Sequence, residues 1–258
     1  MVKNKILLFR GILALYDIDS TPASKEFLEC WQATGRHIQS WGGRGVNWIK
    51  ADPYPPFLEH FSFFYGNQVY FVRIEDADGI LDIPGNPTGF LSIARAWGGH
   101  ACRIVMRKRG ALGWKPVHPG WALQDVESGE VLNPKALATD EKIEVGPWEL
   151  FDFASQVVRD ALVKKGYDIL SSGRNPDIFP SIWVDSPKGR EWILVTASRF
   201  PELTAAIPEG FTNVKKELEL RGYHGNLAHV VFRSLNPEDK RIIRGEGVDV
   251  DFQGLKPL

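Results

Sequence analysis

The sequence predicts a mixed α/β protein, with mixed sheets, built from two tandem copies of one α-β-β-β-α-β unit. Helix-length segments with apolar residues three and four apart alternate with short apolar runs of strand length. Similar segments also recur after 123 residues: Phe27 corresponds to Leu150, and residues 66–73 correspond to residues 189–196. Because the order of elements is preserved as well as single matches, the repeat favours a tandem duplication.

The N-terminal copy begins with an apolar segment, residues 5–16, that is interrupted by Arg10 and Gly11. This segment is expected to form a strand, because it lacks the cleavage signature of a signal peptide. A helix follows, since Phe27, Trp31 and Ile38 share one helical face. The order after the strand is a helix (24–41), three strands (46–50, 60–65, 68–74), a helix (90–97) and two strands (101–107, 121–126).

The C-terminal copy opens with the clearest helix of the chain, residues 147–165. Leu150, Ala154 and Val158 recur one helical turn apart, Pro147 suits the first turn, and Gly166 ends the helix. The copy continues with three strands (167–170, 178–185, 191–197), a helix (211–221) and two strands (227–232, 248–252).

A polar, turn-rich segment, residues 132–146, separates the copies and is expected to be a linker. The predicted domains are therefore residues 1–131 and residues 147–258. A duplication of this kind commonly produces two lobes related by a pseudo-twofold axis, like a homodimer fused into one chain.

A resemblance to a known family rests on residues 162–170, Asn175-Pro176-Asp177 and residues 189–195. With their order of elements, they resemble the core of the PD-(D/E)xK nucleases, which have the restriction-endonuclease-like fold. The resemblance implies that Asp177 would bind a divalent cation together with an acidic residue on the third strand, which also carries a lysine. The third strand instead contains Leu194-Val195-Thr196, and its counterpart contains Phe71-Val72-Arg73. Both copies are therefore expected to be catalytically inactive.

Two alternatives stay open. In the first, the protein is a divalent-metal-dependent nuclease with an irregular site formed by Asp177, Asp185 and Glu191, in which Asp177 and Glu191 bind Mg²⁺. In the second, the order of elements belongs to secretion-chaperone-like domains, which hold segments of partner proteins. Only the first alternative requires a cofactor.

Composition indicates a soluble globular protein, and the cytoplasm is its expected compartment. Its formal net charge of −1 creates no overall positive field that would attract nucleic acid or a membrane. No apolar run approaches the roughly 20 residues that span a bilayer. Cys30 and Cys102 lie on apolar faces and are expected to be small buried residues. Tryptophans at helix and strand positions, including Trp31, Trp41 and Trp48, are expected in the core.

The densest basic stretch contains Arg103, Arg107, Lys108 and Arg109. Strand alternation would place Arg103, Arg107 and Arg109 on one face, as a ridge that contacts phosphates. Together with the missing catalytic pattern, this predicts a non-catalytic binding protein. A protein is the expected partner, nucleic acid is the less favoured one, and the oligomeric state stays open.

Overall fold

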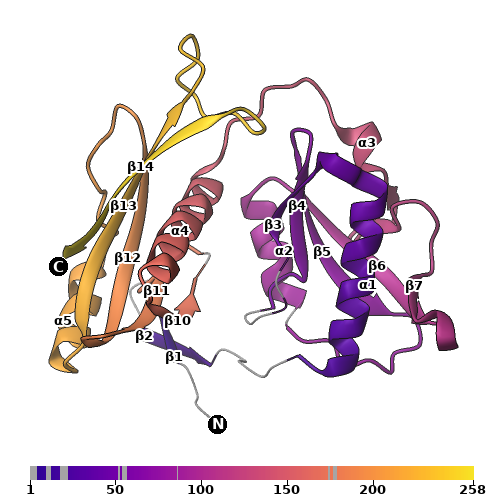
Figure 1. Cartoon of the computed structure of the whole chain (residues 1–258), viewed down its shortest axis with the longest axis horizontal. Coiled ribbons are helices and arrows are strands. Elements are labelled where there is room, and N and C mark those ends of the chain that lie inside the picture. Colours follow the sequence, from indigo (N-terminus) through magenta and orange to yellow (C-terminus); the bar gives the residue numbers. More distant parts are fainter. Residues whose placement is uncertain are drawn as a thin grey trace. The chain divides into compact units, whose positions relative to one another are not determined.

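A computed structural model describes residues 5–9, 13–17, 23–51, 53, 57–85, 87–173, 175–176 and 179–258. The chain divides into two compact units (Figure 1). The N-terminal unit comprises Asp19–Lys142, and the C-terminal unit comprises Ile143–Leu258 together with Met1–Ile18. Each unit combines helices with a mixed sheet, which confirms the predicted α/β class.

The N-terminal unit contains a seven-stranded mixed sheet. Its helices are α1 (Lys25–Gly42), α2 (Pro87–Ala96) and α3 (Pro134–Leu137). Its strands are β3 (Val46–Lys50), β4 (Phe61–Tyr65), β5 (Gln68–Asp76), β6 (His100–Lys108), β7 (Trp114–Pro116), β8 (Leu123–Asp125) and β9 (Val131–Leu132). The strand order is β3-β4-β5-β6-β8-β9, with β7 paired to β6. Strands β5 and β6 are parallel, and the other pairs are antiparallel.

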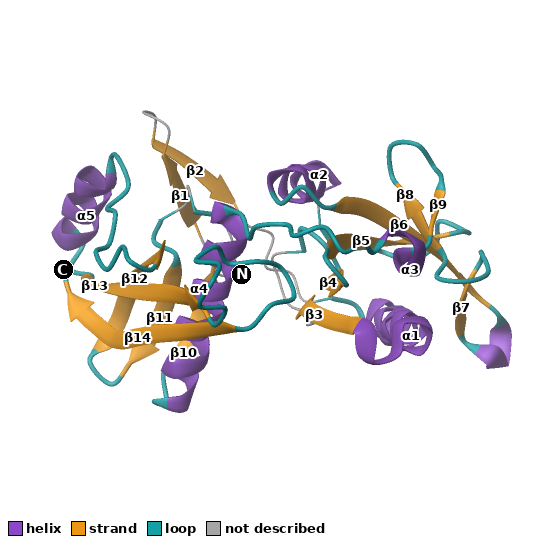
Figure 2. Ribbon diagram, turned by 90° about the horizontal axis from the view of Figure 1, so that it is seen from above, coloured by secondary structure: helices purple, strands orange, loops and turns teal. Residues whose placement is uncertain are grey.

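Helices α1 and α2 cover opposite faces of this sheet (Figure 2). Helix α1 begins after Ser24, whose hydroxyl accepts a hydrogen bond of 3.1 Å from the Phe27 N–H and so caps the first turn. Phe27 and Ile38 are fully buried against the sheet. On the other face, Phe71 of β5 meets Trp97, just after α2, edge to face with ring centroids 5.5 Å apart. Apolar burial on both faces therefore fixes the sheet between the two helices.

The C-terminal unit contains a five-stranded sheet between helices α4 (Pro147–Lys164) and α5 (Phe211–Leu220) (Figure 1). Its strands are β10 (Asp168–Ser172), β11 (Ile182–Ser186), β12 (Gly189–Arg199), β13 (His224–Ser234) and β14 (Val248–Pro257), in that order across the sheet. Strands β12 and β13 are parallel. Val184 and Ile193 belong to the core under α4, whereas Trp192 and Leu194 belong to the core under α5. Successive residues of β12 thus alternate between the two cores.

The two units share one connectivity, and hydrogen-bond register refines the residue correspondence between them. Tyr65 pairs with Gln68 at the β4–β5 turn, and Ser186 pairs with Gly189 at the β11–β12 turn. The two turns are therefore 121 residues apart, two fewer than the separation of 123 that the sequence pattern predicts. A slip of two residues leaves every side chain on its original face, so an apolar pattern alone cannot detect it.

The apolar segment near the N-terminus forms two strands instead of the one expected. Strands β1 (Lys5–Phe9) and β2 (Leu13–Asp17) pair antiparallel in a sheet of their own. The backbone of a lone strand would lack partners, whereas this pairing gives each strand hydrogen bonds along one edge. Both strands group with the C-terminal unit, although the sequence assigns residues 1–131 to the N-terminal copy.

The boundary between the units falls inside the predicted linker, residues 132–146. The first part of that segment is held to the N-terminal unit by Asn67, which is 7% exposed. The Asn67 amide donates to the Thr139 hydroxyl (2.9 Å) and to the Glu141 carbonyl (2.8 Å), and its oxygen accepts from the Thr139 N–H (3.1 Å). Helix α3, which the sequence did not predict, also lies in this segment.

Cys30 and Cys102 are buried, as predicted, and carry free thiols. The expectation that the tryptophans lie in the core fails at Trp41, which is 45% exposed. Trp41 lies in the last turn of α1, beyond Ile38, the last buried position of that helix. Among the helices that the structure describes, none combines the length and apolar character needed to cross a membrane.

Candidate anion-binding site

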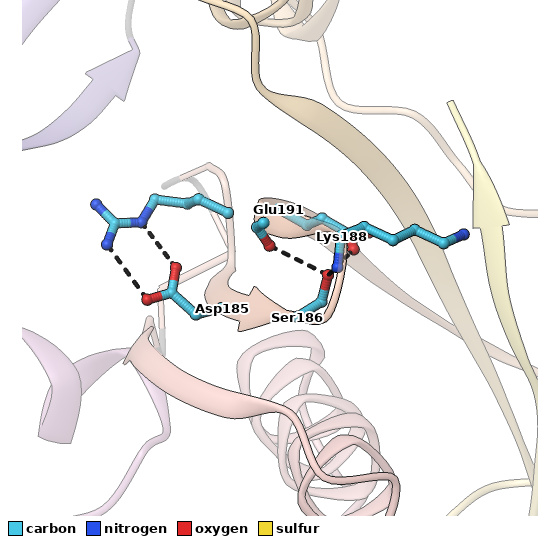
Figure 3. A network of polar contacts seen from close by, with 6 residues as sticks. Asp185, Ser186, Lys188 and Glu191 are labelled. Carbon is cyan, nitrogen blue, oxygen red and sulfur yellow. Dashed lines mark hydrogen bonds and ion pairs between the residues drawn. The ribbon is translucent and has the colours of Figure 1, made fainter.

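Two of the three carboxylates considered for a nuclease lie in the described part of the C-terminal unit, at the β11–β12 hairpin. Asp177 lies outside the described residues. Asp185 accepts hydrogen bonds of 3.0 Å and 3.4 Å from the Arg190 guanidinium, whereas Glu191 accepts a hydrogen bond from the Ser186 hydroxyl (Figure 3). Each carboxylate therefore has its own partner.

Asp185 and Glu191 leave the sheet on opposite faces. Glu191 is paired with Val184, which belongs to the core under α4, so the neighbouring position Asp185 faces the α5 side. On the α4 side, Glu191 accepts a further hydrogen bond of 2.7 Å from the Asn226 amide. In the described ranges of the chain, no three His, Cys, Asp or Glu side chains gather in a way that could hold a metal ion.

In the N-terminal unit, β6 distributes the basic stretch over two faces. Ile104 belongs to the core under α1, so Arg103 and Arg107 lie on the face turned away from that helix. Arg103 lies 3.6 Å from Glu75, and Arg107 forms an ion pair of 3.1 Å with Asp78. These two arginines are therefore largely neutralised by carboxylates of the same unit.

The other two residues of the stretch are placed differently. The Lys108 ammonium lies on the α1 face, where it donates a hydrogen bond of 2.7 Å to Glu26. Arg109 follows the last residue of β6, so strand alternation does not align it with Arg103 and Arg107. The structure does not present Arg103, Arg107 and Arg109 as one ridge.

The basic residues instead contribute to a pocket between α1 and the β6–β7 hairpin. The pocket has a volume of about 380 Å³, within the range of ligand-binding pockets. Its lining includes the cations of Arg36, Lys108 and Lys115, and Glu29 is the single carboxylate among its described lining residues. We call this the cationic pocket.

Two of the three cations in the cationic pocket lack an ion-pair partner among the residues that the structure describes. Within the part of the chain that the structure describes, no carboxylate forms an ion pair with Arg36 or Lys115, whereas Lys108 is paired with Glu26. Both uncompensated cations are exposed at the surface. Their arrangement suits an anionic ligand, because a bound anion would supply the missing negative charge.

His37 also lines the cationic pocket. Its Nε2 lies 3.0 Å from the Gly120 carbonyl oxygen, so that nitrogen carries the proton in the neutral ring. Burial lowers the pKa of His37, and the nearby Lys115 ammonium lowers it further. The imidazole is therefore uncharged at neutral pH, and the positive charge of the pocket comes from the arginine and the lysines.

Arg36 was absent from the residues considered from the sequence. It lies on the exposed side of α1, distant in sequence from Lys108 and Lys115, and a single arginine on a helix surface carries no signal of its own. Only the packing of α1 beside the β6–β7 hairpin brings Arg36 to the two lysines. Lys115 lies beyond the basic stretch, and its side of the hairpin depends on the pairing of β7 with β6.

Comparison with known proteins informs the C-terminal unit alone. Residues 148–258 match the model of a family described as a domain of unknown function (DUF8840). This match covers α4 through β14 and less than half of the chain. No curated protein and no solved structure matches the chain. The function is therefore argued from the geometry of the cationic pocket.

Proposed function

We propose that this is a non-catalytic binding protein whose N-terminal unit holds the phosphate groups of a nucleic acid in the cationic pocket. The observation that carries the proposal is the convergence of Arg36 and Lys115, neither of them ion-paired among the described residues, in a pocket of about 380 Å³. Arginine forks and lysine ammonium groups are the side chains that bind phosphate oxygens most often. Arg109, exposed after β6, adds positive charge nearby.

The balance of charge predicts binding of modest strength and strong salt dependence. The net charge of the whole chain is −1, so attraction is local to the cationic pocket. Exposed cations bind phosphate mainly through counterion release, and the logarithm of affinity falls by about 0.7 to 0.9 for each phosphate contact as the logarithm of salt concentration rises by one. Two or three contacts therefore correspond to a slope of about −2.

The test is fluorescence anisotropy with a labelled oligonucleotide at several salt concentrations. Charge reversal at Arg36 or Lys115 should weaken binding about tenfold and lower the salt slope by about one. Lys135→Glu, an exposed lysine of α3 in the same unit, is the matched control and should leave binding nearly unchanged. Binding that survives both Arg36→Glu and Lys115→Glu would refute this proposal.

The absence of catalysis is a separate part of the proposal. The opposite orientations of Asp185 and Glu191 support it, because a shared cation needs ligands on one side. The protein should leave plasmid DNA intact in Mg²⁺ or Mn²⁺. Cleavage that depends on metal and is abolished by Asp177→Ala would instead establish the metal-dependent nuclease.

We also keep the nuclease-like fold and the tandem duplication as proposals. What supports both is the connectivity of the units: a helix, three antiparallel strands, a second helix and a strand parallel to the third. A later antiparallel strand, β8 or β14, follows in each unit and also suits the secretion-chaperone-like alternative. The free thiols of Cys30 and Cys102 support the expected location in the cytoplasm.

A protein partner is the second candidate, and the loop between β12 and α5 of the C-terminal unit favours it. Phe200, Leu203 and Ile207 in this loop are 36%, 59% and 48% exposed. Large apolar side chains exposed close together commonly mark protein-binding surfaces. A photo-crosslinking amino acid at position 203 should give one recurrent adduct in cells, and that adduct should disappear when Ile207 is changed to Asp.

A further inference from the structure

A second hollow lies on the N-terminal unit, where α1 passes the edge strand β3. It is an open groove of about 330 Å³ lined by Trp31, Trp48 and Phe61. Phe61 is buried beneath it, whereas both tryptophans are half-buried and keep part of their surface exposed. Gly35 leaves room for this arrangement, because a Cβ at that position would come within 3.2 Å of the Phe61 ring. We call this the aromatic groove.

The two indoles of the aromatic groove are held in defined orientations. Trp31 stacks on Phe61 with ring centroids 4.9 Å apart and an interplanar angle of 14°, and its Nε1 donates a hydrogen bond of 3.1 Å to the His60 carbonyl. Trp48 donates from Nε1 to the Gln39 side chain at 2.8 Å. A planar ligand would therefore meet aromatic surfaces that are already ordered, which lowers the entropy lost on binding.

Arg36 belongs to the linings of both the aromatic groove and the cationic pocket. The two hollows therefore adjoin along α1, with Trp31 and Trp48 in one and Lys108 and Lys115 in the other. A ligand that occupies both must combine flat rings with negative charges that reach across Arg36. Single-stranded nucleic acid has this composition, since each nucleotide joins a base to a phosphate.

We propose that the aromatic groove stacks bases of single-stranded nucleic acid whose phosphates enter the cationic pocket. This inference rests on the proposed function and specifies its ligand. A duplex offers its phosphates but keeps the faces of its bases stacked inside, so it can use the cationic pocket alone. Single strands expose base faces, and stacking on aromatic side chains tolerates any sequence.

A proline-rich peptide is the other occupant that a tryptophan-lined groove can take. The surrounding charge favours the nucleic acid, because Arg36 stands at the junction of the two hollows and Lys115 lies beyond it without a carboxylate partner among the described residues. A peptide built of uncharged prolines would leave these cations uncompensated. The same binding experiment distinguishes the two occupants.

The experiment compares three probes of equal length on the full chain: a 12-nucleotide oligothymidine, the same backbone with abasic sites, and the oligothymidine in a duplex. Anisotropy should show the single strand binding at least tenfold more tightly than the abasic strand, because one stacked base contributes about 1–3 kcal/mol. Trp48→Leu should remove most of this difference and leave abasic binding unchanged. An oligouridine of the same length shows whether RNA or DNA is preferred.

Each outcome decides a different point. Equal affinity for the oligothymidine and the abasic strand, both weakened by Lys115→Glu, would overturn the stacking inference and leave the proposed function standing. Binding of none of these probes would overturn both. Binding of a proline-rich peptide, lost in Trp48→Leu, with no preference for bases would assign the aromatic groove to a protein partner. The comparison of probes on the unchanged protein remains decisive even if Trp48→Leu does not fold.

Discussion

Arg244 and Glu149 form a fully buried ion pair that joins two distant parts of the C-terminal unit. The Arg244 guanidinium donates two hydrogen bonds of 2.8 Å to the two oxygens of Glu149, and the side chains are 4% and 1% exposed. The same carboxylate accepts a hydrogen bond of 2.8 Å from the Gly146 N–H, just before α4. One buried carboxylate thus caps the helix and holds the segment that precedes β14.

Removing either partner of this pair should be strongly destabilising, because the other charge would stay buried without compensation. We expect Glu149→Ala to lower the free energy of unfolding by about 3–5 kcal/mol, measured by urea denaturation. Asp160→Ala is the matched control in the same helix, since Asp160 is exposed and lies 3.9 Å from Arg159. The control should change stability by less than about 1 kcal/mol. Similar losses in the two variants would contradict the role given to the buried pair.

The two cysteines provide a probe that reports on the N-terminal unit alone. Cys30 and Cys102 are fully buried, and the C-terminal unit contains no cysteine. Burial raises the pKa of Cys30 to about 12 and raises the pKa of Cys102 as well. Neither thiol should react with a disulfide reagent in the native protein, because the reactive thiolate is absent.

Both thiols should react at once in denaturant, and Glu149→Ala should not speed the reaction in the native protein. Glu149 and Arg244 both belong to the C-terminal unit, so we expect the destabilisation to stay within that unit. The labelling is measured as the absorbance of the thiol that the reagent releases. Rapid labelling of the native protein would show that the N-terminal unit opens more readily than its buried core indicates.

How much of this fold follows from the sequence depends on the kind of signal. The helix that begins at Pro147 is evident, because its apolar residues recur for five turns and Gly166 stops it. Strands β7 and β9 were missed, because two or three residues are too few to show a period. The predicted separation of the two units differs by two residues from the observed one for another reason. The alternation of apolar residues along the strands is clear, but a shift of two residues leaves that alternation unchanged.

The candidate site was harder to predict than the fold. The basic stretch identified Lys108, but the side on which each cation lies, and the carboxylate that it meets, depend on strand pairing. Glu75 and Asp78 neutralise Arg103 and Arg107 only because β5 runs parallel beside β6 in that register. The aromatic groove was not predicted, because tryptophans at helix and strand positions were expected to lie in the core.

The burial of His60 predicts that the N-terminal unit loses stability in acid. The ring is 1% exposed, its Nδ1 accepts a hydrogen bond of 2.8 Å from the Ile74 N–H, and its Nε2 lies 3.1 Å from the Pro84 carbonyl oxygen. Burial, together with the nearby Arg73 guanidinium, lowers the pKa of His60 to about 3. The folded state therefore holds the neutral ring down to strongly acidic pH.

The unfolded chain binds a proton at His60 below about pH 6.5, whereas the folded protein does not. The stability that depends on the neutral ring is complete above that pH and falls by up to about 1.4 kcal/mol for each pH unit between 6.5 and 3. The slope of the free energy of unfolding against pH is measured by labelling Cys30 with dithiodipyridine in urea. This reagent still reacts with thiols in mild acid. His60→Gln should lower stability at pH 7 but flatten the slope, and an unchanged slope would exclude His60 as its source.

Asn67 decides where the N-terminal unit ends. Its side chain makes three hydrogen bonds to Thr139 and Glu141, and these bonds hold the polar segment after α3 against the β4–β5 turn. Asn67→Ala should free this segment and speed cleavage after Glu141 by a glutamate-specific protease about tenfold or more, since the loss of each such bond costs about 1 kcal/mol.

Asn67→Asp keeps the acceptor but loses both donated bonds, so its cleavage rate should lie between those of the alanine variant and the unchanged protein. Asn47→Ala, an exposed position on β3, is the control that should leave the rate unchanged. Gel electrophoresis measures the cleavage rates. Equal cleavage rates for Asn67→Ala and this control would mean that other contacts hold residues 138–142.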